Sequence, residues 1–205
     1  MTDSSSFEVR RPVVRSYLPD YLSNAVKHVR AGGHAIVRAT PSWYLLLPCD
    51  ADGDMPELAA WALLDIGVDR SSVVKDGPAK GLRRARVAKD VRHIVEGWAE
   101  RDSAERKATV VMALDCRACG ACCRHNDVVL EKEDFARWRE ARRDDLAEAK
   151  FLRARKRKLK VLPNGDCVHL RGNDCGIYEV RPDNCRAFPA GSECCLFARD
   201  EQGAR

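Results

Sequence analysis

The segment CRACGACC, residues 116–123, places four cysteines within eight residues. Cys116, Cys119 and Cys122 follow one another at intervals of three residues, and Cys123 comes directly afterwards. Thiols at this spacing on a turn can converge on one soft metal ion, and Gly120 gives the backbone freedom to point amide N–H groups at the sulfurs. The segment therefore predicts a metal-binding loop with three thiolates and one adjacent thiol.

Five further cysteines follow in turn-rich contexts, in the stretches NGDC, GNDC, RPDNC and GSECC. Buried structural cysteines usually lie within apolar strands or helices, whereas these lie beside Gly, Asn and Asp as ligands on loops do. Pro182 suits a first helical turn, so we expect Cys185 near a helix N-terminus, where the dipole lowers a thiol pKa. The expected metal ligands are Cys116, Cys119, Cys122, Cys123, Cys167, Cys175, Cys185 and Cys194, with Cys195 as the alternative to Cys194.

These residues carry a resemblance to a known family. CRACGACC, followed after a charged segment by CVHLRGNDCGIYEVRPDNCRAFP, resembles the YkgJ-like cysteine-cluster proteins, which are zinc- or iron-chelating domains with a CxxCxxCC signature. The resemblance covers about the last ninety residues and implies a bound metal, without implying a reaction. Its most specific parts are the four leading thiols, Ile177-Tyr178-Glu179, Arg181-Pro182, Cys185-Arg186 and Phe188-Pro189.

The chain departs from that family pattern in two places. His169 stands where a large apolar residue is usual, and the cysteines end in the doublet Cys194-Cys195. The histidine could add a ligand, and the doublet leaves the number of ligands open.

The identity of the metal is also open at this point. Zinc takes four thiolates or imidazoles in a tetrahedron, so eight thiols suffice for two zinc sites. Iron–sulfur clusters also take four thiolates, and three thiols at CxxCxxC spacing with a remote fourth is the ferredoxin arrangement. No cysteine here precedes a proline, as the fourth ligand of bacterial ferredoxins does. The cofactor is therefore zinc or iron, with an iron–sulfur cluster as one form of the latter.

Basic and imidazole side chains lie beside the expected ligands. A centre with four thiolates is anionic, and arginines near it can screen that charge or bind an acidic partner. His125 and His169 are more readily explained as polar neighbours than as ligands. The arginines beside the thiols are Arg117, Arg124, Arg171, Arg181 and Arg186.

Composition indicates a folded protein outside the membrane. Hydrophobic residues make up 45% of the 205, the formal net charge is +5, and the longest apolar runs are too short to span a bilayer. The N-terminus lacks the apolar region of a signal peptide, so we expect a cytoplasmic protein. Thiols stay reduced in that compartment, which favours metal binding over disulfides.

Secondary structure patterns predict an α+β fold of two parts, residues 1–107 and 108–205. The first part is expected to be a small helix and hairpin domain of unknown role, and the second an irregular, loop-rich domain held by metal. Residues 18–31 repeat apolar side chains at helical spacing, residues 34–48 form a hairpin, and residues 54–64 form a second helix. A longer helix is expected over Leu82–Trp98.

The second part should contain a charged helix over residues 131–149 that buries Phe135, Trp138 and Leu146. A hairpin should then turn at Asn164 and Gly165, because Asn-Gly supplies positive φ values.

The segment RARKRKLK, Arg153 to Lys160, has six basic residues in eight and could contact a phosphate, a nucleic acid or an acidic protein. Nucleic acid is the weaker choice, because no aromatic side chain is interleaved for base stacking. An edge strand protected from aggregation explains the charges equally well.

Three functions follow from these patterns. The first is a metal-binding protein that chelates zinc or iron, and the second is an iron–sulfur or iron-dependent redox enzyme. The third is a zinc-stapled adaptor for a nucleic acid or a protein. The sequence has no Ser/His/Asp set, phosphate-binding glycine loop or HExxH motif, which disfavours a conventional hydrolase or nucleotide enzyme. Whether the protein is an enzyme of another kind stays open.

Overall fold

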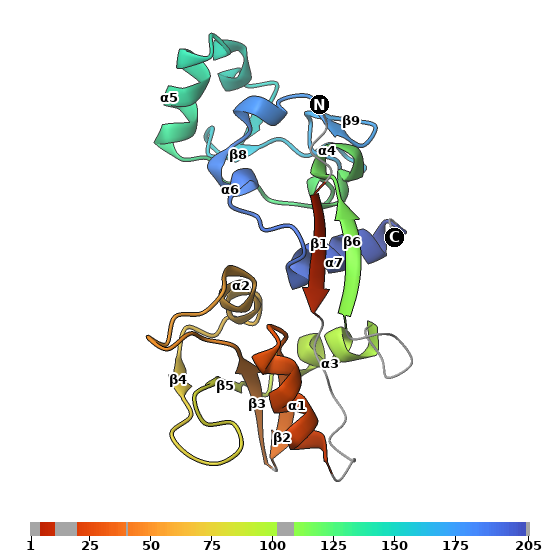
Figure 1. Ribbon diagram of the computed structural model, residues 1–205. Coiled ribbons are helices and arrows are strands. Elements are labelled where there is room, and N and C mark those ends of the chain that lie inside the picture. Colours follow the sequence, from red (N-terminus) through yellow and green to blue (C-terminus); the bar gives the residue numbers. More distant parts are fainter. Residues whose placement is uncertain (1–4, 11–19, 40, 102–108, 204–205) are drawn as a thin grey trace. The chain divides into compact units, whose positions relative to one another are not determined.

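The computed structural model describes residues 5–10, 20–39, 41–101 and 109–203 (Figure 1). The chain divides into two compact units. The front unit is Ser6–Ala113, and the C-terminal unit contains Leu114–Arg205. The boundary expected between residues 107 and 108 lies outside the described residues and stays a prediction.

The front unit is built on an antiparallel sheet with the strand order β2-β3-β5-β4. The predicted hairpin is confirmed, because β2 and β3 pair from Ala35 opposite Leu46 to Ala39 opposite Ser42. The pair β1 and β6 forms a separate two-stranded sheet. The strands as far as residue 114 are β1 (Ser5–Arg10), β2 (Ala35–Ala39), β3 (Ser42–Leu47), β4 (Ser71–Val73), β5 (Arg83–Val87) and β6 (Thr109–Leu114).

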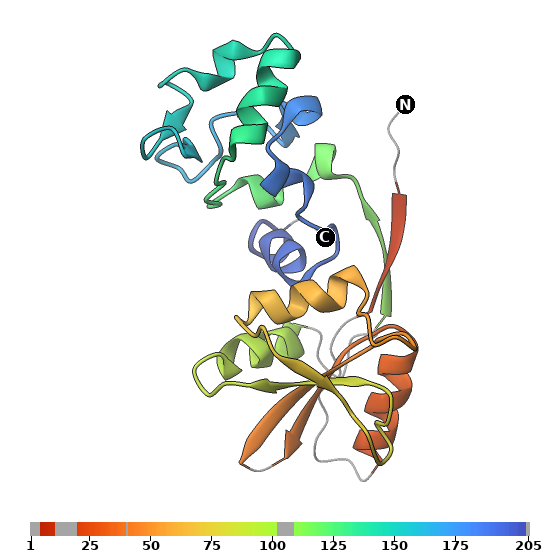
Figure 2. The ribbon, with the colours of Figure 1, turned by 90° about the vertical axis from the view of Figure 1, so that its left-hand side faces the viewer.

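Helices cover both faces of the four-stranded sheet (Figure 2). Helix α1 (Tyr21–Arg30) packs on one face through Ala25 and Val29. Helices α2 (Glu57–Asp65) and α3 (Arg92–Arg101) pack on the other, around Leu45 and its neighbours. The first two helices are confirmed in the described residues, although Leu22, which we expected on the buried face, is 38% exposed.

The long helix expected over Leu82–Trp98 is wrong in its first half. Residues Arg83–Val87 form strand β5, which pairs with β3 and also with β4. Ala85 and Val87 are buried while Arg84 and Arg86 are exposed, so the pattern there has the period of two of a strand. Only the later apolar residues, such as Val95, lie on a helix.

The C-terminal unit is loop-rich, as expected, so the chain as a whole has an α+β fold. Its helices and strands are short. They are α4 (Cys116–Cys119), η1 (Ala121–Cys123), α5 (Lys132–Glu140), η2 (Asp144–Ala147), β7 (Leu152–Arg153), β8 (Lys158–Leu159), β9 (Leu170–Arg171), β10 (Asp174–Cys175), η3 (Tyr178–Val180), α6 (Asp183–Arg186) and α7 (Glu193–Glu201).

The charged helix expected over residues 131–149 ends early, at Glu140. Arg142 has a φ of +56°, which does not occur within a right-handed α-helix, and η2 follows after it. The break turns the chain so that Leu146 reaches the same apolar core as Trp138. The expected burial of these two side chains is therefore correct, although the helix is interrupted.

The basic segment Arg153–Lys160 is a tight hairpin and not an extended edge strand. Strands β7 and β8 pair at its two ends, and Ala154, Arg155 and Lys156 all have positive φ values in the turn between them. Asp127 forms ion pairs with both Arg153 and Lys158.

The Asn-Gly turn is present at Gly165, which has a φ of +90°, and the flanking residues Val161 and Cys167 form a single β-bridge. Within the described ranges, no helix is long and apolar enough to cross a membrane.

Asp134 is the buried link between α5 and α6. Its carboxylate is fully buried, pairs with Arg137, and accepts hydrogen bonds from the backbone N–H groups of Glu131 (2.9 Å) and Asp183 (2.8 Å). One side chain therefore closes a capping box at α5 and also fixes the start of α6.

We expect Asp134→Ala to lower the free energy of unfolding by about 3 kcal/mol, because it leaves buried donors without an acceptor. Urea denaturation can be followed through Trp138, the one tryptophan after residue 114. Glu140→Gln, at the exposed end of α5, is the control and should leave stability unchanged. Equal stability of the Asp134→Ala variant would contradict this role.

Candidate metal centre

The first four thiols lie on two consecutive short helices. Asp115 caps α4, its carboxylate accepting a hydrogen bond from the N–H of Arg117 at 2.9 Å. Gly120 ends α4 with a φ of +58° and begins η1. This left-handed residue reverses the chain, so that α4 carries Cys116 and Cys119 while η1 carries Cys122 and Cys123.

Gly120 also allows a second segment to approach closely. A Cβ atom at this position would lie 2.6 Å from the carbonyl oxygen of Asn173, which is far inside van der Waals contact. Asn173 lies in the turn between β9 and β10. The absence of a side chain at Gly120 therefore lets this turn, and Cys175 beyond it, lie against the first thiol loop.

Backbone hydrogen bonds join the first loop to the segment after Gly165. The N–H of Cys167 donates to the carbonyl of Cys123 at 2.8 Å, and the N–H of His125 donates to the carbonyl of Gly165 at 2.7 Å. Arg124 and Asp166 form a β-bridge between these two bonds. The pairing places Cys167 beside Cys123, although the two residues are far apart in the chain.

The side chain of Arg124 ties three parts of the site together. Its guanidinium donates to the carbonyls of Gly120 at 3.0 Å and Gly172 at 3.1 Å, and to the side-chain oxygen of Asn173 at 3.1 Å. It also forms an ion pair with Asp166 at 3.4 Å. Arg124, expected to screen thiolate charge, instead holds the loops in place.

The last thiols come from α6 and α7. Cys185 lies in α6, whose start is fixed by the bond from Asp183 to Asp134. Cys195 lies in the first turn of α7, where its N–H donates to the capping side chain of Ser192 at 3.2 Å.

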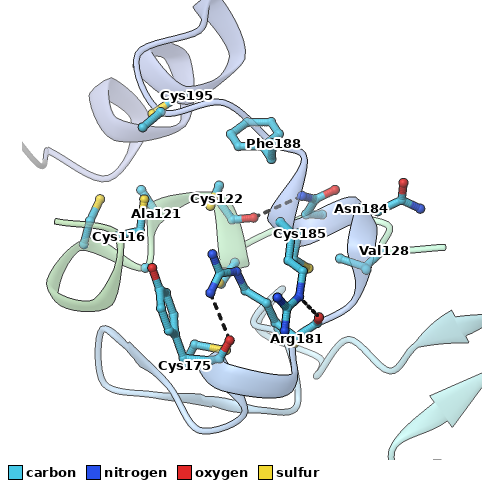
Figure 3. A pocket seen from close by; sticks show the side chains of 18 of the residues that line it. Cys116, Ala121, Cys122, Val128, Cys175, Arg181, Asn184, Cys185, Phe188 and Cys195 are labelled. Atoms are coloured by element: carbon cyan, nitrogen blue, oxygen red, sulfur yellow. Dashed lines mark hydrogen bonds between the residues drawn. The ribbon is translucent and has the colours of Figure 1, made fainter. Parts of the chain in front are cut away.

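Eight of the ten cysteines line one cavity of about 110 Å³, several times the roughly 15 Å³ that a single water molecule requires. Five of these thiols are drawn and labelled around the cavity in Figure 3, with Arg181 among them. Seven of the eight thiols expected from the sequence line the cavity. The full set is Cys116, Cys119, Cys122, Cys123, Cys167, Cys175, Cys185 and Cys195.

The cysteine doublet contributes Cys195 to the cavity. Cys194 is exposed and does not line it, and Cys49 belongs to the front unit, where its thiol lies 3.1 Å from the carbonyl of Gly81. All ten cysteines lie in the described ranges, and none forms a disulfide. Which of these thiols bind metal stays a prediction.

The thiols share a cavity without forming a closed coordination shell. In the part of the chain that the structure describes, no three His, Cys, Asp or Glu side chains form a group that could hold one metal ion.

Burial sets the protonation of most thiols in the cavity. It raises the pKa of Cys185 to about 12, and it also raises the pKa values of Cys116, Cys167, Cys175 and Cys195. The expectation that a helix N-terminus lowers the pKa of Cys185 is wrong, because burial and the neighbouring thiols outweigh the dipole of a four-residue helix. A metal ion that binds here must displace protons from these thiols.

The adjacent thiols of Cys122 and Cys123 share a hydrogen bond. This bond lowers the pKa of Cys122 to about 7 and raises that of Cys123. Cys122 is therefore the thiol of the pair that ionises more readily.

Arginine side chains line the cavity beside the sulfurs. Arg181 stacks on Tyr178 at 3.8 Å, donates to its carbonyl, and lowers the pKa values of several thiols against the effect of burial. Arg199, which is 8% exposed, donates from Nη1 to the sulfur of Cys119 at 3.1 Å. Arg186 also lines the cavity, and its guanidinium donates to the carbonyl of Arg181 at 3.0 Å.

Sequence reasoning missed Arg199. The signal was its position four residues after Cys195 on a helix, which places both side chains on one face. Of the other arginines expected beside the thiols, Arg117 pairs with Asp174 and Glu179, and Arg171 does not line the cavity.

His125 and His169, which lie close to cysteines in the sequence, do not line the cavity. His125 is exposed, and His169 is buried with its ring 4.8 Å from that of Phe151. Burial lowers the pKa of His169 to about 4, so it is neutral at physiological pH.

Residues 115–202 match a family model named CxxCxxCC, described as a "putative zinc- or iron-chelating domain". The match confirms the resemblance found in the sequence and spans the thiol cavity. The similarity to this family is therefore confined to the C-terminal unit. Comparisons with curated proteins and with solved structures gave no match.

We expect Gly120→Ala to destabilise the protein more than Gly172→Ala. Both glycines have positive φ values, +58° and +62°, so both substitutions strain the backbone. A Cβ atom at Gly172 meets nothing within 4 Å, whereas one at Gly120 meets the Asn173 carbonyl. Thermal denaturation of the two variants isolates the close approach, and equal losses would contradict it.

Proposed function

We propose that the C-terminal unit chelates zinc or iron through the thiols of its cavity. The observation that carries the proposal is the gathering of eight thiols from separate segments around one space, with none of them in a disulfide. A purely structural role for so many cysteines would place them apart in the apolar core.

The donors fit a soft or borderline metal. Thiolates bind zinc and iron–sulfur clusters, whereas calcium and magnesium require several oxygen ligands. Asp115 is the single carboxylate among the described residues that line the cavity, and it caps α4. The lining therefore cannot supply the oxygen shell of a hard cation.

Metal binding would also order the unit. A metal ion bound to thiols from separate segments would tie those segments together. The coordination energy then becomes folding energy, which is on the order of 10 kcal/mol for a structural zinc in model peptides. The bonds of Arg124 and the close approach at Gly120 hold the same segments together without the sulfurs.

The two other functions expected from the sequence, a redox enzyme and an adaptor, stay predictions. Two cations of the basic hairpin are already paired within the unit, because Arg153 and Lys158 form ion pairs with Asp127. Arg155, Lys156 and Arg157 are exposed and are the side chains that an acidic partner would contact.

Metal analysis and an absorption spectrum of anaerobically purified protein test the proposal. We expect bound zinc with a colourless protein, or bound iron with acid-labile sulfide and a brown colour. Removal of the metal by a chelator should lower the melting temperature of the C-terminal unit. A protein that neither carries zinc or iron nor takes up either metal under reducing conditions would overturn the proposal.

A further inference from the structure

We propose that the eight thiols form two distinct four-thiol metal sites, an exchangeable one closed by α7 and a structural one set against the apolar core. The inference rests on the chelation proposed above and adds that the thiols are divided between two sites. The α7 site consists of Cys116, Cys119, Cys122 and Cys195. The core site consists of Cys123, Cys167, Cys175 and Cys185.

Helix α7 packs against η1 and so faces the first thiol loop. The bond from Arg199 to the sulfur of Cys119, at 3.1 Å, fixes this contact. Cys195 lies one helical turn before Arg199 and shares its face. The helix therefore delivers one thiol and one positive charge to the loop that carries Cys116, Cys119 and Cys122.

The core site has different surroundings. Cys167, Cys175 and Cys185 pack against the apolar cluster that contains Trp138. The backbone bond from Cys167 to Cys123, at 2.8 Å, brings the fourth thiol to them.

The division runs between Cys122 and Cys123. Cys122 lies on the side of the loop that carries Cys116 and Cys119, whereas the backbone carbonyl of Cys123 accepts the hydrogen bond from Cys167 at 2.8 Å.

The two sites differ in access to solvent. Cys116 is exposed, and the α7 site is closed by a single nine-residue helix. The other three thiols of the α7 site and all four of the core site are partly buried, but three of the core thiols contact the apolar cluster. The α7 site is therefore the one that exchanges metal, and the core site the one that stabilises the fold.

Zinc binding to reduced, chelator-treated protein tests the division, with bound ions counted by native mass spectrometry. Four thiolates per ion predict about two zinc ions in the wild type and about one in Cys195→Ser. Cys194→Ser is the matched control, one residue away on the same helix, and should keep about two. Cys185→Ser should keep about one and lose stability.

A chelator challenge adds a second readout. The wild type should release its zinc in two phases, and Cys195→Ser should lack the fast phase. A single zinc in the wild type, loss of all zinc in folded Cys195→Ser, or loss of zinc in Cys194→Ser would overturn the division while leaving chelation intact. A wild type that binds no zinc and no iron would instead overturn the proposed function.

Discussion

The C-terminal unit depends on the pairing of its first thiol loop with segments that lie much later in the chain. Three contacts make this pairing: the backbone bond from Cys167 to Cys123, the bonds of Arg124, and the close approach of Asn173 to Gly120. None of them involves a thiol side chain. These contacts therefore help to gather the sulfurs, which reduces the conformational entropy that chelation must overcome.

Charge explains why the gathered thiols still need a cation. Burial keeps most of them protonated, and each thiolate that forms raises the pKa of its neighbours. Arg181 and Arg199 offset part of that repulsion. Among the described residues that line the cavity, only Arg181, Arg186 and Arg199 carry a positive charge, which is too little to neutralise eight thiolates. Full ionisation of the thiols therefore requires bound metal. The cavity is thus suited to a metal that brings positive charge and prefers sulfur.

The sequence predicted which cysteines line the cavity better than it predicted the course of the backbone. Cysteine spacing identified seven of the cavity's eight thiols and left the choice between Cys194 and Cys195 open, because only the phase of α7 decides it. The helix expected over Leu82–Trp98 failed because the buried Ala85 and Val87 fit a strand pattern that pairing with β3 selects. The burial of Cys185 and the contact of Arg199 depend on long-range packing, which local patterns do not encode.

The central claim is that the inorganic centre is bound by sulfur from this cavity alone. X-ray absorption at the metal edge of the loaded, reduced protein measures the first coordination shell directly. The structure predicts a shell of sulfur only, at about 2.3 Å if the metal is zinc. A first shell dominated by oxygen or nitrogen would contradict the account. No histidine lines the cavity among the described residues, and Asp115 is the one carboxylate among them that does.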